Sequence, residues 1–546
     1  MSGVAGPGDR AGFTDGTVGA HDPATVATRR ATMLGIALLR ILVFVLVSVM
    51  GVAAPAIARD LDAASRPVFW LSTLYLVGLC AALPAAGWLG DRHGHRRVLL
   101  AGLALFLGGN VLAALAPGIE VLLAARLAQG LGAAAILPAL TAFFLWVTPP
   151  RERGRGDGLL VGAMMVGIAA GPVVGAVLVD GPGWRAVFWT AAGVGALALL
   201  LLLRRGPDPV RDPALELPWR VIVLWAVGIA CVLCGISLGS TDAMLDVQVL
   251  LPVVTGIGLI GGAIAADLRS GVPLLDPRLR GLRIFLVAVC GIACYQWVLL
   301  AFNLAALRYL GVSVGLQPVT AALLLLPALL PIAAMAPVTG RIVDRVGHRP
   351  PLLVGFAGTA LALVAVALVT APPETSAALA AGALVLPFAA FGIAMGLLLV
   401  ALETGAMGRV DRPLRGVAAA LANVSRETAG ALGAAVVAIG WLGSEQRAIE
   451  EALAALPDSA ALMDAGTLDA IAQGIPSRMD RIAVMVPELD GMFDALHRAG
   501  AHTAWLVALA IIAAGAVAGL LVTARWFPRG TRAAQGVESD LVTERR

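Results

Sequence analysis

The sequence carries the same short motif twice, each time between two long apolar segments. The first copy, from Gly87 to Arg97, reads GWLGDRHGHRR, and the second, from Gly340 to Arg349, reads GRIVDRVGHR. Both copies fit the pattern G-x-x-x-D-R-x-G-H-R. A repeat in this setting predicts a membrane domain with two related halves. Such domains are typical of transporters, because a site where the halves meet can open alternately to either side.

The composition indicates that most of the chain lies in a bilayer. Hydrophobic residues make up 59% of the 546 residues and charged residues 14%, with a mean hydropathy of +0.90. A soluble protein of this length could not bury so much apolar surface. The net charge of +4 does not indicate nucleic-acid binding, because the arginines lie at the ends of the apolar segments.

A helix needs about 20 apolar residues to cross a bilayer, and the sequence contains about fourteen such segments. They are expected at 33–57, 70–90, 97–116, 119–147, 157–180, 184–204, 221–239, 247–268, 283–309, 317–338, 350–371, 377–405, 415–442 and 502–526. Arginines concentrate in every second connection. The positive-inside rule therefore predicts a multi-pass protein of the plasma (inner) membrane with both termini in the cytoplasm.

Four stretches carry a family resemblance. They are the loop at 87–97 after the run 70–76; Arg126-Leu-Ala-Gln-Gly-Leu-Gly132; Gly167-Ile-Ala-Ala-Gly-Pro-Val-Val-Gly175; and Asn423-Val-Ser-Arg-Glu-Thr-Ala-Gly-Ala-Leu-Gly433. In their order and spacing they make residues 33–526 resemble the major facilitator superfamily, and within it the fourteen-helix drug:proton antiporter group.

The resemblance implies an all-α integral membrane protein with two six-helix bundles, an inserted helix pair and alternating access between the bundles. The expected divisions are a disordered cytoplasmic tail (1–32), the N-terminal bundle (33–204), the inserted pair with its loops (205–282), the C-terminal bundle (283–526) and a second cytoplasmic tail (527–546). An acidic outer loop at 443–500 shows helical spacing of apolar residues. We expect short amphipathic helices there, forming a solvated cap or attracting cationic substrates.

The resemblance implies that the repeated loops form a conformational latch. Asp91 follows a helix end, where it can accept charge-assisted hydrogen bonds from a neighbouring helix N-terminus or an arginine. Gly94 permits a tight turn, and Asp344 is the counterpart of Asp91. The alternative is an ordinary positive-inside turn. The latch residues are Gly87, Asp91, Arg92, Gly94, Arg96, Arg97, Gly340, Asp344, Arg345 and Gly347.

The glycines of the third stretch predict a closely packed helix face. Gly167, Gly171 and Gly175 are four residues apart and therefore share one face, which allows tight packing against a neighbour. Gly171-Pro172 would kink or locally unwind the helix. The resemblance implies a hinge at this place, and the alternative is a plain packing face.

Ionisable residues at membrane depth indicate the functional site. Glu427 lies near the middle of its span, where burial disfavours the charged carboxylate, so it is the candidate for proton coupling or cation recognition. The alternative is a static ion pair with Arg426, Arg126 or Arg40. The resemblance implies a cavity role for Arg126, which could instead bond backbone carbonyls. Arg40 could snorkel, and Glu403 could be an interfacial carboxylate.

The sequence departs from the family in the first span. An acidic residue is usual early in that span, and counting back from Pro55 places Leu46 there. Proton coupling at this position is impossible, which leaves Glu427 as a replacement or a different coupling. Tyr295, Gln296 and Asn303 form a further polar group, which could face a central cavity or join helices.

These observations predict a proton-coupled efflux antiporter of amphipathic small molecules, of the multidrug type. The alternatives are a dedicated exporter of one metabolite or lipid with another coupling, and a non-transporting sensor. The chain is not expected to be an enzyme, since no metal-ligand set or nucleophile elbow occurs in the sequence. We expect no cofactor and no metal, a proton gradient as the driving force, the lipid bilayer and a small-molecule substrate as partners, and a monomer.

Overall fold

The computed structural model describes residues 23–63, 65–147, 153–203, 218–238, 247–269, 283–370, 377–407, 410, 415–454 and 487–527. Helices joined by short connections make up these residues, and the described part contains no strand. The all-α membrane fold expected from the sequence is confirmed.

The first half of the chain forms six membrane spans, and a turn at Val49 divides the first of them. The helices are α1 (Pro23–Ser48), α2 (Met50–Asp60), α3 (Ser65–His93), α4 (His95–Ala114), α5 (Ile119–Val147), α6 (Arg153–Asp180) and α7 (Arg185–Leu203). Since α1 begins at Pro23, residues 23–32 are helical and not part of a disordered tail. Residues 1–22 of that predicted tail lie outside the described residues.

The inserted pair and the second half follow in the expected order. The helices are α8 (Trp219–Leu238), α9 (Val247–Arg269), α11 (Arg283–Arg308), the π-helical turn η2 (Tyr309–Ser313), α12 (Pro318–Leu324), α13 (Leu326–Val346), α14 (Arg349–Val369), α15 (Ala377–Met407), α16 (Arg415–Ala454) and α19 (Pro487–Trp526).

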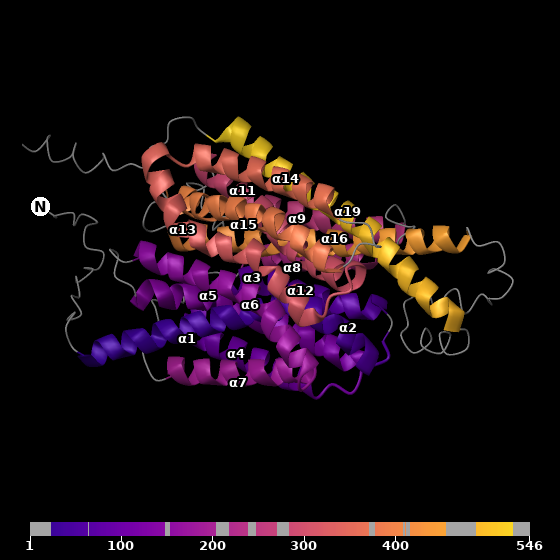
Figure 1. Ribbon diagram of the computed structural model, residues 1–546. Helices are drawn as coiled ribbons and strands as arrows, with labels where there is room; N and C mark the ends of the chain where they lie inside the picture. The colour runs from indigo at the N-terminus through magenta and orange to yellow at the C-terminus, as the bar shows by residue number, and fades with distance from the viewer. Residues whose placement is uncertain are drawn as a thin grey trace, which may run out of the picture.

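Helices α16 and α19 are both 40 residues long and extend beyond the other helices at one end of the bundle (Figure 1). The flanks of the predicted outer loop 443–500 are therefore continuations of these two long helices, where short separate helices were expected. Residues 455–486 lie outside the described residues.

Thirteen described segments are long and apolar enough to cross a membrane. Helix α16 is not among them, because polar residues including Asn423, Arg426 and Glu427 lower its mean hydropathy. It nevertheless packs within the second bundle, against α11 and α19. With α16 the described helices account for the fourteen spans expected from the sequence.

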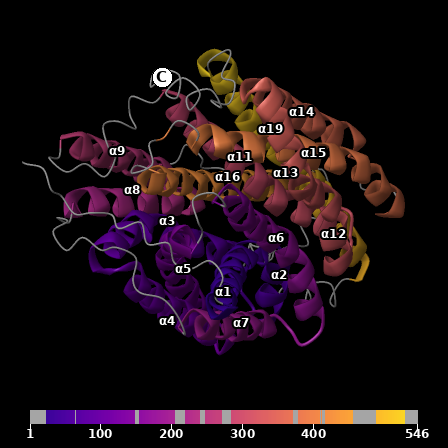
Figure 2. The same ribbon diagram turned by 90° about the vertical axis from the view of Figure 1, so that its left-hand side faces the viewer.

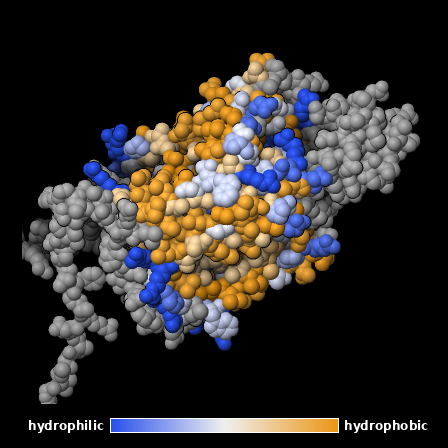
Figure 3. Space-filling model, turned by 90° about the horizontal axis from the view of Figure 1, so that it is seen from below, coloured by the Kyte–Doolittle hydropathy of each residue, from blue (hydrophilic) through white to orange (hydrophobic). Residues whose placement is uncertain are grey.

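Viewed along the helices, the two halves form two bundles side by side, with α8 and α9 at one flank (Figure 2). The bundles meet along a seam where α3 packs against α16, and α6 packs against α12 and α13. Helix α8 contacts both α3 and α16, so the inserted pair flanks this seam. Apolar side chains cover a broad band of the surface, and hydrophilic ones gather chiefly towards its ends (Figure 3).

Both copies of the repeated motif lie at the same end of the molecule. Helix α1 begins at the left in Figure 1, the chain reverses at each short connection, and α13 returns to the left. We call this end the motif end; the turns at Gly94 and Gly347 define it.

At the opposite end, Asp60, the last residue of α2, accepts hydrogen bonds from residues at the start of α7. Trp184 Nε1 donates a hydrogen bond to Asp60 Oδ2 at 3.0 Å, and Arg185 Nη1 donates another at 2.5 Å. Arg185 also donates through Nη2 to the carbonyl of Ala116 at 3.2 Å. One carboxylate and one guanidinium thus connect α2, the α4–α5 turn and the start of α7.

Candidate functional site

The two copies of the motif have the same backbone turn. Gly94 (φ +99°) and Gly347 (φ +79°) both adopt the left-handed conformation that glycine tolerates best. The first glycine of each copy, Gly87 or Gly340, sits in a helix, where an added Cβ would meet no atom within 4 Å. The repeat in the sequence is therefore also a repeat in local structure.

The histidines of the two copies take different positions. His95 Nε2 lies 3.1 Å from Asp91 Oδ1, and its ring occupies the space where a Cβ of Gly90 would be. In the second copy Val343 stands in place of Gly90, and His348 lies against Gly405 and Phe527. A side chain at position 90 would overlap the His95 ring, so this conformation requires a glycine there.

The contacts of Asp91 differ from the predicted latch. It bonds the side chain of His95, the first residue of α4, and among the described residues it bonds neither a backbone N–H of that helix nor an arginine. Arg92 lies over the Trp88 ring at 5.2 Å. Asp344, Arg97 and Arg345 are exposed at the motif end, and Arg96 is half-buried. A latch that joins the two halves stays a prediction.

The predicted glycine face of α6 packs against α1. A Cβ on Gly167 would lie 2.6 Å from the carbonyl oxygen of Ile41. A Cβ on Gly171 would overlap the Ser48 side chain, and one on Gly175 would overlap the Val49 side chain. Helix α6 continues unbroken through Pro172, so the local unwinding expected at Gly171-Pro172 is absent. The packing face is present, and its use as a hinge stays a prediction.

Arg126 connects three helices of the first half and is fully buried. Its Nε donates to the Leu71 carbonyl on α3 at 2.9 Å, its Nη2 to the Leu46 carbonyl on α1 at 3.1 Å, and its Nη1 to Gln129 Oε1 at 2.7 Å. Its guanidinium also lies 4.4 Å from the centroid of the Tyr75 ring. Of the two roles weighed from the sequence, bonding to carbonyls is the one with direct contacts.

The first span thus offers Arg126 a backbone oxygen at the position where the family usually has an acid. Leu46 contributes its carbonyl, and Gln129 extends the network by donating to Asn110 Oδ1 at 3.2 Å and to the Gly109 carbonyl at 3.3 Å. No carboxylate among the described residues bonds Arg126. Its positive charge is stabilised by dipoles of the first half.

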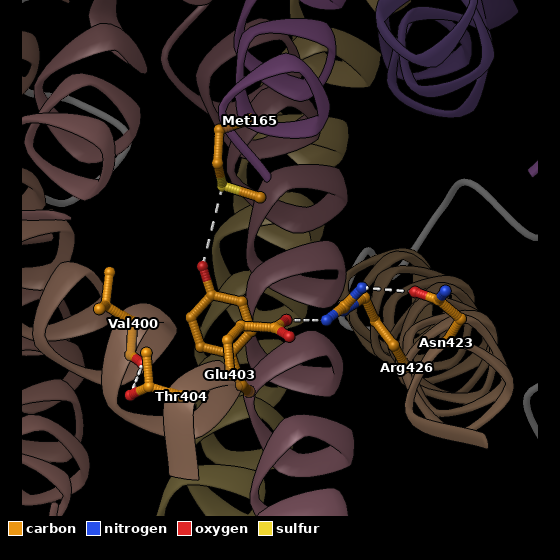
Figure 4. A network of polar contacts seen from close by, with 7 residues as sticks. Met165, Val400, Glu403, Thr404, Asn423 and Arg426 are labelled. Atoms are coloured by element: carbon orange, nitrogen blue, oxygen red, sulfur yellow. Dashed lines mark hydrogen bonds and ion pairs between the residues drawn. The ribbon is translucent and has the colours of Figure 1, made fainter. Parts of the chain in front are cut away.

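Arg426 is held by two partners in the second half (Figure 4). Its Nη2 donates to Glu403 Oε1 of α15 in an ion pair, and its Nη1 donates to Asn423 Oδ1 at 2.8 Å. The Arg426 side chain is 3% exposed and that of Glu403 is 24% exposed. Glu403 is therefore the ion-pair partner of a buried arginine rather than a carboxylate of the membrane interface.

Glu427 is buried at the seam and has no bonded partner. It is 4% exposed, and among the described residues it makes neither a hydrogen bond nor an ion pair. The positive charges of Arg426 and Arg40 act on it, and its own charge acts on Tyr75 and Cys80 of α3. The static ion pairs considered from the sequence are absent, and Arg40, only 5% exposed, does not snorkel out of the bundle.

The polar group on α11 is divided between two environments. Tyr295 donates from its hydroxyl to Met165 Sδ of α6 at 3.8 Å, which connects the two halves, and Gln296 packs over Gly430 of α16. Asn303 lies two turns further along α11. Gln296 Oε1 and Asn303 Nδ2 are buried without a hydrogen-bond partner in the part of the chain that the structure describes. Arg40, Tyr295, Glu403, Arg426 and Glu427 are thus linked around the seam by bonds or by charge, and Arg126 is connected to the same group through Tyr75, on which both Arg126 and Glu427 act.

A comparison with known families decides the class of this protein. The sequence profile of the Major Facilitator Superfamily matches residues 36–434. The chain belongs to the major facilitator superfamily. This family and this fold are those of membrane transporters and not of enzymes.

Curated superfamily members are similar along most of the chain. "Multidrug resistance protein Stp" of Mycobacterium tuberculosis (strain CDC 1551 / Oshkosh) is 28% identical over 523 residues, which cover 93% of this chain and 94% of that protein. "Tetracenomycin C resistance and export protein" of Streptomyces glaucescens is 28% identical over 429 residues, 77% of this chain and 78% of that protein.

Solved structures of transporters show the same fold at low identity. An inward-facing, unoccupied bacterial homolog of the human lysosomal transporter Spinster has a TM-score of 0.59 and 17% identity, and the match covers 93% of this chain and 98% of that chain. A peptide transporter POT in complex with sulfate has a TM-score of 0.56 and 16% identity, with 90% and 94% coverage.

Sequence reasoning about this superfamily member missed several contributors to the site. Gln129 and Asn423 lie three residues from Arg126 and Arg426, and in both pairs the amide oxygen accepts a bond from Nη1. Because residues three apart share a helix face, this spacing was a usable signal. Tyr75 and Cys80 had no such signal, since their importance comes from the packing of α3 against α16.

Proposed function

We propose that this transporter is a proton-coupled efflux antiporter of amphipathic small molecules, working by alternating access of its two halves. The observation that supports this best is the buried Glu427 carboxyl, which has no bonded partner among the described residues and lies where α16 meets α3. A carboxyl at such a place can take up a proton or a cationic group without first breaking an ion pair. The names of the relatives, which refer to multidrug resistance and to export, agree with efflux.

The proposal includes the plasma membrane as the location, with the motif end and both termini on the cytoplasmic side. The arginines of the motif end, including Arg92, Arg97 and Arg345, support this orientation.

Transport by purified protein in liposomes tests this function. With an imposed pH gradient, the wild-type protein is expected to move a fluorescent amphipathic cation against its gradient. Glu427→Gln should abolish the dependence on the pH gradient. Glu120→Gln is the matched control, because Glu120 is an exposed carboxylate at the start of α5. Unchanged pH dependence in Glu427→Gln would contradict the assignment.

A second candidate is a dedicated exporter of one metabolite or lipid with a different coupling. It is favoured by Leu46, which bonds Arg126 through its carbonyl at a position where this group usually has an acid. A panel of chemically diverse amphipaths separates the two candidates, since a dedicated exporter should accept one chemical class only.

A further inference from the structure

The carboxyls of Glu403 and Glu427 both lie near the Arg426 guanidinium in the second half, and one of them is bonded to it. Glu403 of α15 is bonded to the Arg426 guanidinium, and Glu427, the next residue in sequence, is not. Asn423 holds the other terminal nitrogen of Arg426 at 2.8 Å, one turn earlier on α16. Each terminal nitrogen of the guanidinium thus donates to a partner other than Glu427, while Nε is buried without a partner among the described residues.

The direction in which the Arg426 side chain points determines whether it can form an ion pair with Glu427. Side chains of adjacent residues diverge by about 100° around a helix. An arginine side chain is long enough to turn back towards its neighbour if nothing holds it elsewhere. A buried carboxylate that gained this partner would be stabilised in its charged form.

From this arrangement we propose that Glu403 is a positioning residue: it keeps the Arg426 guanidinium from pairing directly with Glu427 and so keeps the Glu427 carboxyl available for proton exchange. This inference rests on the proposed coupling role of Glu427. It assigns to Glu403 a part that does not require contact with the substrate. Asn423 supports the same position of the guanidinium from within α16.

Other charged and titratable groups from neighbouring helices also interact electrostatically with Glu427. They are Arg40 from α1 and Tyr75 and Cys80 from α3. Helix α11 contributes Tyr295 next to Arg426. Helices α8 and α19 also pack against α16, and the described charges that act on Glu427, those of Arg426 and Arg40, come from α16 and α1.

An infrared pH titration of the full protein in lipid tests this directly. The absorption band of the protonated Glu427 carboxyl is assigned by its loss in Glu427→Gln. Glu403→Gln should free Arg426 to approach Glu427, so that the midpoint of this band moves to lower pH by about one unit. Glu403→Asp should retain the wild-type midpoint, and Thr404→Ala, an exposed neighbour on α15, is the local control.

A double substitution decides whether Glu403 acts through Arg426. In an Arg426→Gln background, the further change Glu403→Gln should leave the midpoint where Arg426→Gln alone puts it. An equal shift with and without Arg426, or no shift in Glu403→Gln, overturns the inference. If Glu403→Gln does not fold, Asn423→Ala removes the other partner and must move the midpoint in the same direction, or the inference fails.

The titration distinguishes this inference from the proposed function. It measures the protonation of Glu427 in the absence of any substrate or flux. Wild-type protein that shows no proton-driven transport would contradict the proposed function while leaving the titration result intact. The pH profile of transport, where transport occurs, should move to lower pH in Glu403→Gln together with the infrared band.

Discussion

Gly90 lies directly beneath the imidazole ring of His95, and Val343 fills the equivalent position in the second half. The two loops share their turn and the charged residues of the motif, and in the first the ring reaches back to the aspartate. A Cβ at position 90 would overlap the ring, so a valine at this position is incompatible with the His95 conformation of the first loop.

Gly90→Val should convert the first loop into the second. The new side chain would displace His95 and remove its bond to Asp91, and we expect a loss of about 1–3 kcal/mol from overpacking and local rearrangement. Thermal unfolding of the detergent-solubilised protein measures this loss. Gly87→Val is the control, since a Cβ at Gly87 meets no atom within 4 Å. Equal stability of the two variants would show that His95 does not depend on the space at Gly90.

Gly167→Ala should weaken the packing of α6 against α1. The added Cβ would lie 2.6 Å from the Ile41 carbonyl oxygen, a backbone atom that can move only if the helices separate. We expect a destabilisation of about 1–3 kcal/mol, seen as a lower unfolding temperature. Gly162→Ala, on the same helix but facing open space, should be neutral. A loss of stability in Gly162→Ala as large as in Gly167→Ala would contradict this account.

Arg126→Lys should destabilise the first half. A lysine keeps the charge but cannot reach the carbonyls of Leu46 and Leu71 and the Gln129 amide with the planar geometry of a guanidinium. Loss of charge-assisted bonds in a buried site costs about 2 kcal/mol, measured as a lower unfolding temperature. Arg97→Lys at the exposed motif end provides the matched control. If both variants unfold at the wild-type temperature, the network around Arg126 does not contribute to stability.

The cluster at Asp60 should give the stability a dependence on acid pH. Hydrogen bonds from Arg185 and Trp184 hold the pKa of the Asp60 carboxyl below its usual value. The stabilisation is therefore complete above pH of about 4 and is lost as the pH falls through the lowered pKa. Because Asp60 and Arg185 are both well exposed, we expect less than about 1 kcal/mol.

Thermal unfolding of Asp60→Asn and the wild-type protein across pH 7 to pH 3 measures this contribution. The variant should unfold at a lower temperature at neutral pH, and the difference should disappear in acid. Asp62→Asn is the control, since Asp62 makes no hydrogen bond or ion pair with the described residues. A difference that is constant with pH would mean that the Asp60 charge is not the cause.

Apolar segment length predicted the helices well, because the bilayer requires both apolar side chains and a fully bonded backbone. The span at 415–442 was also expected from its apolar length, and α16 covers it in spite of the charges at its centre. The ends were predicted less well: α1 and α19 begin before their apolar parts, and α16 continues past its own. Outside the bilayer a helix can continue on polar residues, and apolar length then carries no information.

The members of the site were predicted from membrane depth, but their partners were not. Glu427, Arg426, Glu403 and Arg40 could each be named as charges in apolar surroundings. That Arg426 bonds Glu403 depends on how α15 packs against α16, and no spacing within one helix determines that. The different positions of His95 and His348 required the comparison of Gly90 with Val343, which only the structure suggested.

The Arg126 guanidinium donates hydrogen bonds to the main-chain carbonyl oxygens of Leu46 in α1 and Leu71 in α3. Every residue type supplies such an oxygen. Leu46 and Leu71 are fully buried, so a substitution at either position must fill the same space in the core but keeps the acceptor in place. The attachment of Arg126 therefore depends on the path of the main chain in α1 and α3, and it tolerates a change of residue type that preserves this path.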